Sequence, residues 1–239
     1  MDNLTTNIKN SAEGTAIDLS ETLVCKYLGY KRGRVSPRIK NCVRQTLKIL
    51  NRLARPAWCC RIYPVTVHGG HIYIGNTGFR VASRKIGRVL SVCTHTAVCA
   101  VTLGRQVDAF INTGSPHETY IRDTAASLAA EDLMDQCQEH IETALPPLQG
   151  ATKRYSPGYC DWNVSAQQGL FRLFPADKLG IRLSDSFLMS PRKSITAVFG
   201  IGKRAEVDEY GNACFNCEYV TCPHRRISSK EHMPEATAV

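Results

Sequence analysis

The densest group of chemically versatile residues in this sequence is Arg154-Tyr155-Ser156-Pro157-Gly158-Tyr159-Cys160-Asp161-Trp162. Proline fixes φ and glycine reaches backbone conformations closed to other residues, so the stretch predicts a loop with defined backbone donors and acceptors. Arg154 adds a planar cation that can fork onto a carboxylate or phosphate, and the aromatic residues add flat apolar faces. Local composition alone favours an ordinary turn with aromatic anchors, because Pro-Gly marks turns of every kind.

A second group lies near the C-terminus, where Cys214, Cys217 and Cys222 precede His224. Three thiols so close in sequence indicate a metal site better than any single pair, but the common sites need four ligands. Cys160 or His224 would supply the fourth. An iron–sulfur cluster and a structural zinc both stay open, since the spacing fits no standard ferredoxin pattern. The alternative interpretation is a set of reduced cysteines in a flexible end.

The elements that would position these residues follow from hydrophobic periodicity. The most helical segment is 118–145, whose apolar stripe comprises Ala125, Leu128, Ala129, Leu133 and Cys137. Glu131 and Asp135 lie close to that stripe, where a carboxylate is ordinarily a solvated charge. Further patterns predict helices at 20–30, 37–54, 83–90 and 105–112, and strands at 58–66, 71–74 and 95–104.

Composition limits the classes of protein to consider. The 239 residues are 43% hydrophobic and contain no apolar run long enough to span a bilayer and no signal-peptide pattern. The net charge of +9 raises nucleic acid as a partner, but no nucleic-acid-binding motif accompanies it. A solvated basic face, or a docking face for an acidic protein, is the favoured account.

Cysteine usage points to a reducing compartment. Eleven cysteines are an odd number and cannot all pair internally. Those in apolar or helical contexts are expected to pack as reduced, small hydrophobic residues: Cys25, Cys42, Cys93, Cys99 and Cys137. We therefore expect a cytoplasmic protein with a loose leader at 1–18, one domain at 19–205, and a Cys-rich tail at 206–239 with a disordered end.

Several motifs in order carry a family resemblance. The run Arg154 to Tyr159, then Ser184-Asp185-Ser186-Phe187-Leu188-Met189-Ser190-Pro191, then Ser194 to Val198, resembles the C-terminal reactivation domain of cobalamin-dependent methionine synthase. The resemblance covers roughly residues 120–200, and the whole chain looks most like the short, free-standing relatives of that domain. It implies an α+β fold with helices around a twisted, mostly antiparallel sheet.

The resemblance also implies a site for S-adenosylmethionine. Glu131 corresponds to a glutamate on the family's helix, and the loop contributes Arg154, Ser156, Pro157, Gly158 and Tyr159. Tyr159 is expected to face cobalamin, and we add Trp162 to that face. The family's aspartate nearer the N-terminus has no counterpart that we can place.

The implied task is repair of a partner's cofactor. S-adenosylmethionine would methylate cob(II)alamin during its one-electron reduction, on a methionine synthase or another corrinoid protein, with an electron donor such as flavodoxin or ferredoxin. The chain would then be the methyltransferase component of that reaction. Two alternatives stay open: a non-catalytic adaptor for a corrinoid protein, and an iron–sulfur module that only delivers electrons.

Overall fold

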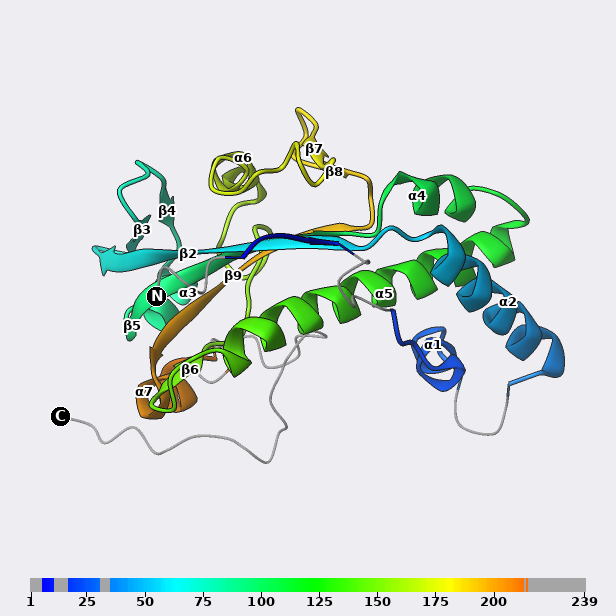
Figure 1. Ribbon diagram of the computed structural model, residues 1–239, viewed down its shortest axis with the longest axis horizontal. Helices are drawn as coiled ribbons and strands as arrows, with labels where there is room; N and C mark the ends of the chain where they lie inside the picture. The colour runs from blue at the N-terminus through cyan, green and yellow to red at the C-terminus, as the bar shows by residue number, and fades with distance from the viewer. Residues whose placement is uncertain (1–5, 11–16, 31–34, 213, 215–239) are drawn as a thin grey trace. The chain divides into compact units, whose positions relative to one another are not determined.

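The computed structural model describes residues 6–10, 17–30, 35–212 and 214, with only the backbone for 6–10. The main sheet has seven strands in the order β4-β3-β2-β5-β9-β6, and β1 pairs separately with β2 (Figure 1). Its strands are β1 (Thr6–Asn10), β2 (Ala57–His68), β3 (His71–Ile74), β4 (Arg80–Ala82), β5 (Cys93–Thr102), β6 (Gln149–Ala151) and β9 (Ser194–Lys203). A two-stranded ribbon is formed by β7 (Arg182–Leu183) and β8 (Met189–Ser190).

The helices complete an α+β fold, as predicted. They are α1 (Glu21–Tyr27), α2 (Pro37–Leu53), α3 (Arg84–Leu90), α4 (Arg105–Ile111), α5 (Pro116–Thr143), α6 (Gln167–Leu170) and α7 (Arg204–Tyr210). A short 3-10 helix, Val164–Ala166, precedes α6. Every strand pairing with a described register is antiparallel. No described helix combines the length and the apolarity needed to cross a bilayer.

The chain packs into two compact units, each built from three separate stretches. Of the described residues, those within 1–62, 98–144 and 164–197 form unit 1, and those within 63–97, 145–163 and 198–239 form unit 2. The boundaries between them fall inside β2, β5 and β9, so each of these long strands belongs to both units. Periodicity along the chain did not indicate this division, because it depends on contacts between distant segments.

Unit 1 is organised by α5, which contacts α1, α2 and α4 (Figure 1). The predicted stripe on α5 is buried, and so are Val43, Leu47 and Leu50 of α2. Both helices start as their sequences indicate, each with a serine N-cap followed by proline in the first turn. Amphipathic periodicity thus identified the helices and also the faces that they bury.

Unit 2 contains a hairpin in which two of the predicted strands meet. Strands β2 and β3 pair antiparallel from Val65 opposite Ile74 to His68 opposite His71. Gly69 and Gly70, which form the turn, have φ of 58° and 77°, a region that glycine enters without steric cost. Helix α3 contacts β3 and α7, and α7 contacts β6.

The cysteines follow the prediction with one exception. Cys25, Cys93, Cys99 and Cys137 are buried, while Cys42 is only half-buried. Burial, with a smaller contribution from Glu206, raises the pKa of the Cys93 thiol to about 12. A thiol in such surroundings stays protonated and packs as an apolar group.

Two predicted boundaries differ from the observed elements. The expected leader, 1–18, includes strand β1, which pairs with β2. The polar Thr6–Asn10 sequence has no strand alternation, so its conformation comes from the pairing with β2. Helix α7 crosses the expected start of the tail at residue 206.

Candidate functional site

The loop at 154–162 belongs to unit 2 and is fixed at its N-terminal end by main-chain hydrogen bonds. Tyr155 pairs with Val198 of β9 through both backbone groups, each at 2.8 Å. Just before the loop, the Lys153 amide donates to the Gly211 carbonyl at 3.0 Å. The loop therefore leaves the edge of β9 and starts beside the C-terminal end of α7.

Hydrogen bonds within the loop define a tight double turn. The Gly158 amide donates to the Trp162 carbonyl at 2.8 Å, and the Tyr159 amide donates to the Ser156 carbonyl at 3.1 Å. Gly158 has a φ of 100°, and Cys160 has a φ of 54°. A positive φ is costly for a residue with a Cβ, so the surrounding structure must hold Cys160 in place.

Asp161 holds the C-terminal end of the loop against the first turn of α3. Its carboxylate accepts hydrogen bonds from Ser83 Oγ at 2.6 Å, the Arg84 amide at 2.8 Å and the Lys85 amide at 3.3 Å. Burial raises the pKa of this carboxyl, but these hydrogen bonds outweigh burial and hold the pKa below its ordinary value. This role of Asp161 was not predicted from the sequence, because nothing local links Asp161 to a helix start about eighty residues earlier.

The loop presents its tip to solvent. Tyr159 is 40% exposed, and a Cβ built on Gly158 would meet nothing within 4 Å. Trp162, in contrast, is 3% exposed and belongs to the core of unit 2. This burial is at odds with the expected cobalamin-facing role of Trp162, which needs a ring open to a partner. The reason is the turn at Cys160, after which the chain heads into the core.

Glu131 belongs to unit 1 and lies on the exposed side of α5. One helical turn earlier, Ser127 Oγ accepts a hydrogen bond from Lys193 Nζ at 2.8 Å. Lys193 is only 8% exposed, and its Nζ also lies 2.8 Å from Asp123 Oδ1. Residues four apart on a helix are neighbours, so the Lys193 ammonium lies on the same helix face as Glu131.

The motif at Ser184–Pro191 forms the turn and the second strand, β8, of the β7–β8 ribbon in unit 1. The Ser184 amide donates to the Leu188 carbonyl at 2.9 Å, and the Ser184 hydroxyl accepts from the Leu188 amide at 3.1 Å. Buried Gln167 donates to Thr196 Oγ1 at 2.6 Å and to Met189 Sδ at 3.3 Å. The Ser184–Pro191 motif therefore lies next to the start of β9.

The predicted site residues divide between the two units. Glu131 belongs to unit 1, whereas Arg154, Ser156, Pro157, Gly158 and Tyr159 belong to unit 2. Arg154, Ser156 and Pro157 are half-buried, and Gly158 and Tyr159 are exposed. Within unit 2 the structure brings the loop residues together with Asp161 and the start of α3.

Most of the predicted metal ligands lie outside the described residues. Cys217, Cys222 and His224 are in that part of the chain, and only Cys214 and Cys160 are described. Cys160 is exposed and Cys214 is half-buried. Among the residues that the structure covers, no three His, Cys, Asp or Glu side chains converge on a common metal position. The metal site stays a prediction.

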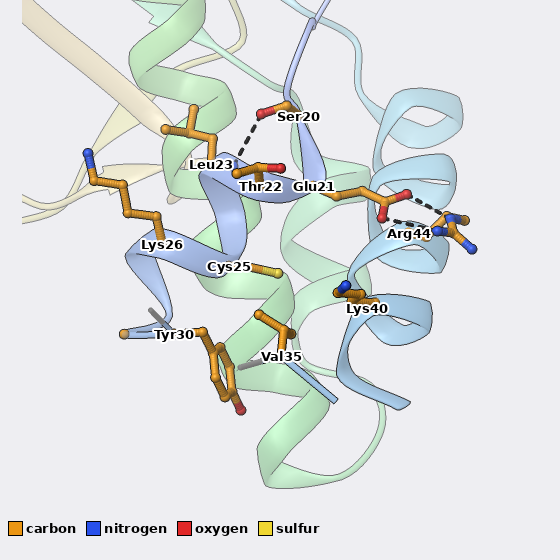
Figure 2. Close-up of a pocket in the computed structure, with 11 residues that line it drawn as sticks. Ser20, Glu21, Thr22, Leu23, Cys25, Lys26, Tyr30, Val35, Lys40 and Arg44 are labelled. Carbon is orange, nitrogen blue, oxygen red and sulfur yellow. Dashed lines mark hydrogen bonds and ion pairs between the residues drawn. The ribbon is translucent and has the colours of Figure 1, made fainter. Parts of the chain in front are cut away.

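A cavity of about 880 Å³ lies between α1 and α2 in unit 1 (Figure 2). Glu21 and Arg44 close one side through hydrogen bonds of 2.7 and 3.2 Å. Lys26, Lys40 and the buried Cys25 also line it. The cavity includes none of the residues predicted to bind S-adenosylmethionine.

Comparison with solved structures finds a likeness to a crystal structure of the MetH reactivation domain bound to AdoHcy. The two chains superpose with a TM-score of 0.56 over 82% of this chain and 78% of that one, at 16% sequence identity. No family model matches the sequence, and no curated protein is significantly similar to it. At this identity the likeness establishes the fold. It confirms the fold predicted from the motifs.

Proposed function

We propose that the chain binds S-adenosylmethionine and supports the reductive methylation of a cobalamin carried by a separate protein. The observation that carries the proposal is the fold, which is like that of a reactivation domain bound to AdoHcy. AdoHcy is what remains of S-adenosylmethionine after methyl transfer. The Arg-x-x-Pro-Gly-Tyr loop, with a fixed backbone and an exposed tip, supports the same assignment.

The residues of the loop suit the methyl donor chemically. S-adenosylmethionine carries a carboxylate, an ammonium, a sulfonium and an adenine, so its site needs an anion clamp, a carboxylate and polar backbone groups. Arg154 would hold the carboxylate through a forked pair of hydrogen bonds. The open space beside Gly158 would let a ligand approach the main chain at the tip of the loop, where Ser156 and Pro157 would contribute polar backbone groups.

Methyl transfer needs no side-chain base in this scheme. A reduced corrinoid on the partner supplies the nucleophile, and the chain's contribution is to orient the sulfonium methyl for in-line attack. Tyr159, exposed at the tip of the loop, would contact the corrin. The partners that this scheme requires are a methionine synthase or another corrinoid protein, and an electron donor such as flavodoxin or ferredoxin, in the cytoplasm.

The test is anaerobic calorimetric titration of S-adenosylmethionine into the wild-type protein and an Arg154→Ala variant. Hydrogen bonds to charged groups contribute about 1.5–3 kcal/mol, so the variant should bind at least about tenfold more weakly. Arg80→Ala is the matched control, because it removes the same charge from an exposed position in unit 2. We expect it to bind as the wild type does.

Two outcomes would contradict the proposal. Folded wild-type protein that shows no saturable binding would favour the adaptor or the electron-delivery module. Equal weakening in Arg154→Ala and Arg80→Ala would mean that general electrostatic attraction, rather than a clamp at Arg154, brings the ligand to the protein.

A further inference from the structure

Asp161 makes an unusual connection within unit 2. Its two carboxylate oxygens accept from one hydroxyl and two amides, all at the start of α3 and 76 to 78 positions earlier in the chain. The Ser83 hydroxyl takes part twice, since it also accepts from the Ile86 amide at 3.1 Å as the N-cap. A single side chain thus completes the cap of α3 and fastens the loop to it.

The loop needs this attachment because its own conformation is strained. Cys160, directly before Asp161, has a φ of 54°, which residues with a Cβ rarely adopt. Such a conformation persists only where the flanking residues are held. On one side the chain is held at Tyr155 by β9, and on the other side it is held at Asp161 by α3.

The charge of Asp161 makes the attachment strong. Its three donors include two amides of the first turn of α3, which carry partial positive charge. A carboxylate accepts such hydrogen bonds more strongly than a neutral group does.

We infer that Asp161 is a positioning residue, which holds the Ser156–Trp162 loop against α3 in the conformation that receives the methyl donor. This inference rests on the proposed function for its ligand. Asp161 acts through the loop, because its own oxygens are occupied by Ser83, Arg84 and Lys85. A ligand then meets a preformed backbone and does not have to order it.

The experiment compares the wild type with Asp161→Asn, which keeps the side chain's shape and removes its charge. Hydrogen–deuterium exchange of the free proteins should show faster exchange of the Gly158, Tyr159 and Trp162 amides in the variant, with the amides of β9 unchanged. Calorimetry should show S-adenosylmethionine bound about tenfold more weakly, as expected if about a tenth of the molecules hold the binding conformation. Saturating ligand should restore protection of the loop, because it selects that conformation.

Ser36→Ala is the matched control. It removes another serine N-cap, that of α2 in unit 1, where Ser36 Oγ accepts from the Ile39 amide. It should lower the melting temperature and leave both the loop protection and the affinity for S-adenosylmethionine unchanged. Where Asp161→Asn folds too poorly to titrate, Ser83→Ala removes one of the three hydrogen bonds and should give a smaller change of the same kind.

The outcomes separate this inference from the proposed function. Two results for Asp161→Asn would overturn the inference and leave the proposed function standing. One is faster exchange of the loop amides with unchanged affinity for S-adenosylmethionine, and the other is unchanged exchange of the loop amides. No binding by the wild type would overturn the proposed function and the assigned ligand, while the exchange of the free proteins would still report whether Asp161 holds the loop.

Discussion

Helices α3 and α5 begin in contrasting ways. Helix α5 has a complete local capping box: the Glu118 amide donates to Ser115 Oγ, and the Ser115 amide donates to Glu118 Oε2. Helix α3 has a serine N-cap too, but its next two amides donate to Asp161 from a distant loop. The start of α5 is therefore self-contained, whereas the start of α3 is shared with the candidate site.

The difference extends to the bodies of the two helices. Helix α5 has 28 residues and an apolar stripe of its own, while α3 has only 7 residues. A helix of two turns has little stability alone and depends on its surroundings. The C-terminal end of α3 is accommodated by Gly200 of β9, where a Cβ would lie 2.8 Å from Leu90 Cδ2 and would clash with Cys93 Sγ. Distant residues thus support α3 at both ends.

The strongest test of this dependence is Gly200→Ala. The added methyl group has no space between β9 and the end of α3, so we expect a loss of about 1–3 kcal/mol in the free energy of unfolding. Urea denaturation measures it. The control is Gly87→Ala within α3, whose Cβ would lie at an ordinary 3.4 Å from Val67 Cγ1 and would favour the helix. Equal loss in both variants would show that crowding at Gly200 is not the cause.

The two serine caps provide the next test. Ser83→Ala should cost about 1–2 kcal/mol, because the hydroxyl both caps α3 and donates to Asp161. Ser115→Ala should cost about 0.5–1 kcal/mol, because its losses are confined to an exposed first turn. Thermal or urea unfolding measures the loss of stability in each of the two variants. A double-mutant cycle of Ser83 with Asp161 should be non-additive, and additivity would mean that the loop and the cap are independent.

The smallest change in stability is expected when the pH is lowered. The folded-state pKa of Asp161 is below its ordinary value of 3.8, so its stabilisation is fully present above that value and is lost as the pH falls through the folded pKa. Melting temperatures of the wild type and Asp161→Asn should differ by a constant amount near neutral pH and converge in strong acid. A difference that already shrinks near neutral pH would contradict the hydrogen-bonding account.

Much of the fold was predictable because it is local. Hydrophobic periodicity marked α2 and the body of α5, and Gly69-Gly70 separated the strands that became β2 and β3. Helix α5 starts at Pro116, two residues before the predicted start at 118. The short elements were less accessible: β6, α7 and the β7–β8 ribbon carry too few residues for a period to stand out. Strand β1 depends on its pairing with β2, which no pattern within Thr6–Asn10 indicates.

The sequence by itself determined which residues are special: the Arg154–Trp162 stretch with its proline and glycine, the periodic faces of α2 and α5, and the motifs that resemble a reactivation domain. Only the tertiary structure decided that Trp162 is buried, that Tyr159 is exposed, and that Asp161 caps α3. The physical reason is the separation along the chain over which each interaction acts. Helix caps, turns and periodicity act over a few residues, whereas burial and a carboxylate's choice of amides depend on which distant segments the fold brings together.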